Sequence, residues 1–241
     1  MMWITWRRHR IGILTLTLIW LALVTVMVVT ERQYDSAAIA CAHVAHQLAK
    51  QGACRTAQGR WQTRDQTFVL GLMLWPILIG LIIGAPLVAS EIETRTNRLA
   101  WSQGVTRSKW LLVSWTTLAV PAAAATALLQ LVVQWWATHV YLVPMAGVTT
   151  TIPTDLTGVS PVAIALFALS FGTWVGARLR IVSIASAVAL LLPLIAFAMI
   201  SINTNTNGRY PLSQWGVTGI YLALAATFLA LSLLTVRRWR A

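Results

Sequence analysis

The stretch FVLGLMLWPILIGLIIGAPLV, residues 68–88, contains no Asp, Glu, Lys, Arg or His. A helix rises about 1.5 Å per residue, so this stretch is long enough to cross a hydrocarbon layer of about 30 Å. Backbone polar groups in lipid must pair within the protein, and a long run without strict apolar and polar alternation favours a helix over a barrel strand. The stretch therefore predicts a membrane-spanning helix.

Five more uncharged apolar runs flank this one, and the first is too long for a signal peptide and lacks a small-residue cleavage site. The six predicted spans are Ile11–Val29, Phe68–Val88, Leu111–Ala137, Pro161–Ala177, Ile181–Ile200 and Trp215–Val236. The remaining residues are too scattered for a second globular domain. We therefore predict an all-α integral membrane protein with six transmembrane helices in a single domain, residues 1–241.

The composition agrees with this class. The 241 residues are 58% hydrophobic and 10% charged, whereas a typical soluble domain carries about 25% charged residues. The mean hydropathy is +0.71. These values exclude a disordered chain, a disulfide-rich secreted scaffold and an ordinary soluble enzyme.

The net charge of +12 reflects topology. With six spans, both termini, the loop 89–110 and the hairpin 178–180 share one side, which holds 12 Lys and Arg against 6 on the other side. The positive-inside rule makes the richer side cytoplasmic, so no nucleic-acid partner is needed to explain the charge. Tryptophans at the span ends suit interfacial anchors: Trp3, Trp6, Trp110, Trp215 and Trp239.

The predicted external loop, Thr30–Thr67, contains both cysteines. Cys41 and Cys54 lie on the oxidising side, so they are expected to form a disulfide. Helical spacing of apolar residues over Ser36–Gln51 predicts a short external helix pinned by this bond. The alternative is a metal site, for which the candidate ligands are Cys41, His43 and His46. Their spacing matches no strong ligand pattern, so we expect no metal.

The spans lack the residues of several functional classes. The chain has no G-x-x-x-x-G-K-[ST] motif with which to bind ATP. No apolar run contains a carboxylate or histidine, which disfavours proton-driven carriers. No catalytic set gathers at a membrane face, so the chain is not expected to be an enzyme or to hold a cofactor.

Two features within the spans predict contacts between helices. Gly80 and Gly84 form a G-x-x-x-G pair, as do Gly172 and Gly176, and such pairs allow close helix packing, either within the chain or between two copies. A polar face in the third span consists of Thr126, Gln130, Gln134 and Thr138. This face predicts either interhelical hydrogen bonds or the wall of a translocation pathway.

The loop after the second span reads ASEIETRTNRLAWSQGVTRSKW, residues 89–110. Ser90 is expected to cap a helix whose first turn carries Glu91 and Glu93, as the helix dipole favours. Residues 99–101, Leu-Ala-Trp, then offer an apolar surface. The segment is expected either to rest on lipid headgroups or to dock onto a cytoplasmic partner.

This loop resembles the motif E-x-E-x-G-T-x-R-L-A-W-T-Q-x-V-T-R-x-R-W of type-2 ABC exporter permeases, in particular those common in actinobacteria. The matching residues are Glu91, Glu93, Thr96, Arg98, Leu99, Ala100, Trp101, Gln103, Val105, Thr106, Arg107 and Trp110. Arg95 stands where the family usually has Gly, and Ser102 and Lys109 are mild departures. Residues 3–10 and 156–169 are also similar to the corresponding segments of that family.

The resemblance implies a mechanism in which ATP is hydrolysed outside this chain. Two permeases, identical or paralogous, pair in a bacterial cell membrane above two separate ABC ATPase subunits, which bind ATP and Mg²⁺. The loop Glu91–Trp101 acts as the coupling helix, and residues 3–10 form a short interfacial segment. The implied coupling residues are Glu91, Glu93, Thr96, Arg98, Leu99 and Trp101.

The substrate is not readable from the sequence. Uncharged spans are compatible with export of a drug, an antibiotic, a peptide or a lipid. The alternative function is a non-transporting membrane receptor or immunity protein that binds a ligand through the loop Thr30–Thr67.

The topology can be tested by cysteine labelling of intact cells. In a Cys41→Ser/Cys54→Ser background, an impermeant thiol reagent should label Gln58→Cys, because that position is predicted to be external. The same reagent should leave Ser102→Cys unlabelled until the cells are opened. The reverse labelling pattern would place the termini outside the cell.

Overall fold

The computed structural model describes residues 2–42, 71–94, 106–142, 158–191 and 214–238, and the statements below concern these residues. The second span consists of α-helical residues 71–79, the π-helix η2 (Gly80–Gly84) and α3 (Ala85–Glu93). The other helices are α1 (Met2–Ala42), α5 (Arg107–Leu142), α6 (Ser160–Leu179), Val182–Leu191 and α8 (Gln214–Arg237). No strand occurs among the described residues.

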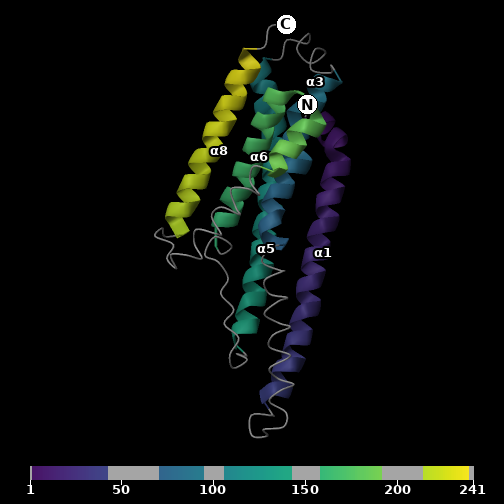
Figure 1. Cartoon of the computed structure of the whole chain (residues 1–241), viewed down its shortest axis with the longest axis vertical. Helices are drawn as coiled ribbons and strands as arrows, with labels where there is room; N and C mark the ends of the chain where they lie inside the picture. Colours follow the sequence, from purple (N-terminus) through teal and green to yellow (C-terminus); the bar gives the residue numbers. More distant parts are fainter. Residues whose placement is uncertain (1, 43–70, 95–105, 143–157, 192–213, 239–241) are drawn as a thin grey trace.

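The long helices form one elongated bundle and run roughly along a common axis (Figure 1). Five of them are long and apolar enough to cross a membrane: His9–Arg32, Gly71–Glu93, Arg107–Trp136, Ser160–Leu179 and Trp215–Arg237. They coincide with five of the six predicted spans. Of the remaining one, Ile181–Ile200, the structure describes the helix Val182–Leu191, and its later residues lie outside the described part of the chain.

Helix α1 corrects two expectations about the N-terminal part of the chain. It is a single helix from Met2 to Ala42, so residues 3–10 continue the first span and do not form a separate interfacial segment. The loop expected from Thr30 does not begin there either. No Gly or Pro occurs between Ile13 and Gln51, and charged side chains such as Glu31 and Arg32 end the apolar run without ending a helix.

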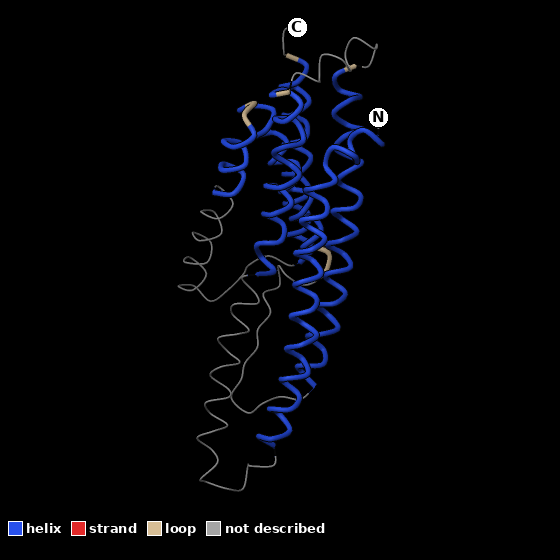
Figure 2. Tube along the Cα trace, turned by 90° about the vertical axis from the view of Figure 1, so that its right-hand side faces the viewer, coloured by secondary structure: helices blue, strands red, loops and turns tan. Residues whose placement is uncertain are grey.

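The centre of the bundle is made by the second span and α6, with α1 and α8 on the two outer sides in Figure 1. Figure 2 shows the described helices from the side, running along the same long axis. In the most apolar window of the second span 67% of the residues are buried, against 11% for α1 and 17% for α8. Trp110, one of the predicted interfacial anchors, is 6% exposed and packs against the hydrophobic core. Trp215 is 74% exposed, as expected of an anchor.

The two G-x-x-x-G pairs pack against each other within the chain. A Cβ atom built on Gly80 would lie 2.7 Å from the carbonyl oxygen of Ala168, and one on Gly84 would lie 2.8 Å from that of Leu169. A Cβ on Gly172 or Gly176 would collide with the backbone of the second span. The helices therefore approach more closely than any side chain permits, which is how small residues join helices in lipid.

The π-helix η2 lies at this crossing and has an identifiable cause. Pro86 has no N–H, and a proline ring clashes with the carbonyl one turn before it. In η2 the N–H of Ala85 bonds to the carbonyl of Gly80, five residues earlier. This wider turn leaves the carbonyl of Leu81 without its usual donor, and the hydroxyl of Ser186 lies 3.5 Å from it.

Helix α8 is held to α6 mainly by aromatic side chains. Phe228 lies edge-on to Phe171 with ring centroids 5.2 Å apart, and its centroid is 5.3 Å from that of Trp174. Near the N-terminal ends of the two helices, the hydroxyl oxygens of Ser160 and Thr218 are 2.9 Å apart, and both side chains are buried. Aromatic pairs of this geometry contribute about 0.5–1.5 kcal/mol each beyond their buried area.

The crossing predicts a sharp contrast between two glycine substitutions. Gly172→Ala should destabilise the protein by about 1–3 kcal/mol, because the added Cβ collides with the backbone at Gly80. Gly219→Ala on α8 is the matched control, since nothing lies within 4 Å of its Cβ position. Thermal unfolding in detergent, monitored by size-exclusion recovery, measures both. Equal midpoints for the two variants would contradict this account of the crossing.

Candidate functional site

One end of the bundle gathers the segments expected to be cytoplasmic. The start of α1, the end of α3, the start of α5 and the ends of α6 and α8 lie together there (Figure 1). Eight described Lys and Arg side chains belong to these segments: Arg7, Arg10, Arg107, Lys109, Arg178, Arg180, Arg237 and Arg238. We call this the basic end of the bundle.

The second span reaches the basic end as a helix that ends at Glu93. Ser90 was expected to start a new helix, but it lies in the last turn of α3, where its carbonyl accepts bonds from the N–H (3.1 Å) and the hydroxyl (2.7 Å) of Thr94. No Gly or Pro follows Pro86 to stop the helix earlier. Glu91 and Glu93 therefore occupy the C-terminal turn of a helix, where its dipole disfavours negative charge.

Glu93 finds a more favourable environment on a neighbouring helix. Its Oε2 atom accepts a hydrogen bond of 3.3 Å from the backbone N–H of Val182, the first residue of the helix Val182–Leu191. The carboxylate thus lies at a helix N-terminus, where unpaired N–H groups and the dipole favour a negative charge. Glu93 joins the loop after the second span to the start of the fifth predicted span, a contact that the sequence analysis did not predict.

The turn that leads into this helix is tight. Helix α6 ends at Leu179, and the next residue, Arg180, adopts the left-handed conformation (φ 63°) and donates its N–H to the carbonyl of Gly176 at 3.1 Å. Only Arg180 and Ile181 separate α6 from Val182, so α6 and the fifth predicted span form a close antiparallel pair. At the same end, Nε of Arg237 donates to the hydroxyl of Ser108 at 2.8 Å and ties α8 to α5.

The structure places the predicted coupling residues only in part. Glu91 is half-buried and Glu93 is exposed at the basic end. The other four, Thr96, Arg98, Leu99 and Trp101, lie outside the described residues. The described geometry therefore fixes where the loop leaves the second span and what it touches there.

The residues on the polar face of α5 differ in how deeply they are buried. Thr126 is 2% exposed; its hydroxyl accepts from the indole N–H of Trp75 at 3.0 Å and donates to the carbonyl of Ala122 at 2.8 Å. Interhelical hydrogen bonding, the structural alternative, is thus observed for this residue. Gln130 is buried and Gln134 is exposed, while the side chain of Thr138 lies outside the described part.

The predicted disulfide and the alternative metal site are not placed by the structure. Cys54, His43 and His46 lie outside the described residues, and of Cys41 only the helical backbone is described. Among the described residues, no cluster of three or more His, Cys, Asp or Glu could hold a metal ion. The Cys41–Cys54 bond stays a prediction.

Comparison with known proteins agrees with this architecture. The model of a family described as ABC-2 membrane transporter related matches residues 12–205, well over half of the chain. No curated protein and no solved structure matches. The matched range includes the glycine crossing, Glu93 and its contact with Val182, and it favours a transporter permease over the receptor alternative. The chain thus belongs to the ABC-2 membrane transporter related family, as a multi-pass membrane permease of the ABC-2 type.

Proposed function

We propose that this chain is the transmembrane subunit of an ATP-driven exporter, coupled to separate ATPase subunits through the loop that follows the second span. The observation that carries the proposal is the contact between Glu93 and Val182 at the basic end. Family membership supports association with ABC ATPase subunits in general. The charge asymmetry of the sequence supports a cytoplasmic location for the basic end.

The described contacts supply a route by which a push on the loop would reach several helices. The loop leaves α3 without a helix break before Glu93, so an axial force on it is passed directly to the second span. The glycine crossing passes that force to α6, because backbone atoms there leave no room for independent sliding. Glu93 passes it to the helix Val182–Leu191.

ATP hydrolysis and transport take place in different subunits. Two ATPase subunits bind ATP and Mg²⁺, and their closure moves the coupling loops of two permeases, which are identical or paralogous. The paired permeases lie in a bacterial cell membrane, with termini in the cytoplasm. This chain supplies no catalytic residue; it converts loop movement into a change in helix packing. The exported molecule is a drug, an antibiotic, a peptide or a lipid.

Trp101 and Arg98 are the expected anchors of the loop on the ATPase, since Trp and Arg dominate binding energy at protein interfaces. Trp101→Ala, and to a lesser extent Arg98→Ala, should weaken ATPase association by about 1–3 kcal/mol. The measurement is the amount of ATPase that co-purifies per permease. Trp215→Ala, which removes an exposed indole at the opposite end of the bundle, is the control. If Trp101→Ala and Arg98→Ala retained as much ATPase as the control, the proposed coupling through this loop would be contradicted.

Glu93 should affect coupling more than assembly. Glu93→Ala removes a helix-capping acceptor whose loss costs about 0.5–2 kcal/mol, so the permease should fold and retain its ATPase. The stimulation of ATP hydrolysis by the permease in proteoliposomes should fall, whereas Glu93→Gln, which keeps an acceptor oxygen, should restore part of it. Glu31→Ala, on α1 outside the basic end, is the control. Full stimulation by Glu93→Ala would show that this contact transmits nothing.

A further inference from the structure

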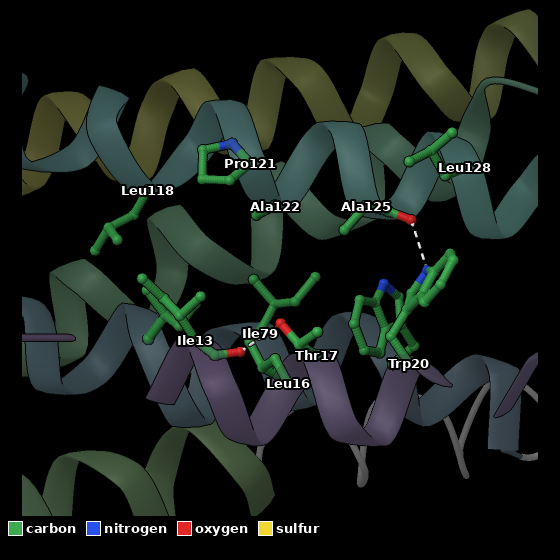
Figure 3. A pocket seen from close by; sticks show the side chains of 12 residues that line it. Ile13, Leu16, Thr17, Trp20, Ile79, Leu118, Pro121, Ala122, Ala125 and Leu128 are labelled. Atoms are coloured by element: carbon green, nitrogen blue, oxygen red, sulfur yellow. Dashed lines mark hydrogen bonds between the residues drawn. The ribbon is translucent and has the colours of Figure 1, made fainter. Parts of the chain in front are cut away.

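A cavity of about 300 Å³ lies between α1, the second span and α5 (Figure 3). Its floor is formed by buried apolar side chains, among them Leu16 of α1, Ile79 of the second span and Leu118 of α5. Above the floor, the half-buried side chains of Ile13, Trp20 and Pro121 form its inner wall. Thr17 and Leu128 line it as well and are exposed on the outside of the bundle. The cavity thus has a closed floor and an opening on the side of these two residues.

The cavity exists because α5 offers small side chains where its neighbours offer large ones. Residues 121–125 of α5 read Pro-Ala-Ala-Ala-Ala, and Pro121, Ala122 and Ala125 face the cavity. Two indole rings, those of Trp20 and Trp75, also line it. Their N–H groups donate to the carbonyl of Ala125 and to the hydroxyl of Thr126, each at 3.0 Å. These bonds hold α1 and the second span to α5, so the cavity has fixed walls.

The lining of the cavity suits an apolar ligand such as a hydrocarbon chain. Each indole N–H is used within the protein, and the hydroxyl of Thr17 donates to the carbonyl of Ile13 at 2.9 Å. No polar hydrogen of a lining side chain is left for a ligand. Water needs two to four polar partners to occupy a cavity, and apolar cavities stay dry.

The depth of the cavity determines what can reach it. Ile79 and Pro121 lie near the middle of the spans Gly71–Glu93 and Arg107–Trp136, so the opening faces the hydrocarbon layer of the bilayer. If the cavity were empty, the side chains that line it would lack dispersion contacts on one side. Hydrocarbon chains of the surrounding bilayer can supply these contacts. We propose that this cavity binds one acyl chain of a bilayer phospholipid, which enters beside Thr17 and Leu128. This binding does not depend on the proposed transport function.

The probe is a phospholipid with a photoreactive diazirine in the middle of one acyl chain, mixed into vesicles of phosphatidylethanolamine and phosphatidylglycerol. The full chain is reconstituted, irradiated and digested, and the adducts are located by mass spectrometry. Adducts on half-buried cavity residues such as Trp20 and Pro121 should exceed those on Leu14 and Leu18, which are 61% and 67% exposed on α1. Inner-wall residues without adducts would overturn the proposal.

Two variants decide whether the adducts arise in the cavity. Ala125→Leu fills it and should lower inner-wall adducts severalfold, while adducts on Leu14 persist. Ala124→Leu is the matched control, because Ala124 is exposed and does not line the cavity; its adducts should equal those of the wild type. If Ala125→Leu does not fold, as judged by its thermal midpoint, Thr17→Leu narrows the opening from an exposed position. Unchanged inner-wall adducts in the folded filling variant would refute acyl-chain binding.

Discussion

The arrangement of this protein depends on one close contact between two helix backbones. In lipid, the hydrophobic effect does not drive helices together, so dispersion contacts and hydrogen bonds must hold them together. Gly80 and Gly84 of the second span meet Gly172 and Gly176 of α6 without intervening side chains. The most buried spans of the bundle are these two, and the remaining helices pack around them. The π-helix at the crossing adapts the second span to Pro86, which would otherwise distort the helix where the contact is closest.

Apolar run length predicted most of the fold because one physical constraint governs it. A helix that crosses lipid must be apolar over enough residues to span it, so five predicted spans coincide with helices long and apolar enough to cross a membrane. Helix ends outside the lipid were harder to predict. Membrane hydropathy stops at charged residues, but α1 continues through Glu31 and Arg32 to Ala42, and α3 continues through Ser90 to Glu93. A capping residue such as serine starts a helix only where the preceding chain is not already helical.

The candidate site was predictable only where a motif names its residues. Glu93 was identified by resemblance, but its partner is a backbone N–H 89 positions away, and backbone donors leave no trace in a sequence pattern. The polar face of α5 shows a different limit. Helical threonines bond to carbonyls one turn back, as Thr17 and Thr126 both do, so they can face lipid or protein at little cost. Their spacing alone therefore cannot separate a pathway from a packing surface. The run of four alanines after Pro121 was the available signal for the cavity.

The unbroken length of α1 has a mechanical consequence. Met27 of this helix is fully buried, and fifteen more helical residues follow it to Ala42, a distance of about 22 Å. No Gly or Pro interrupts this stretch, so the helix carries a tilt at Met27 to its far end. A rotation of about 10° around Met27 would displace the tip by about 4 Å. A small tilt at Met27 would thus become a larger displacement at Ala42, the end of α1 far from the basic end (Figure 1).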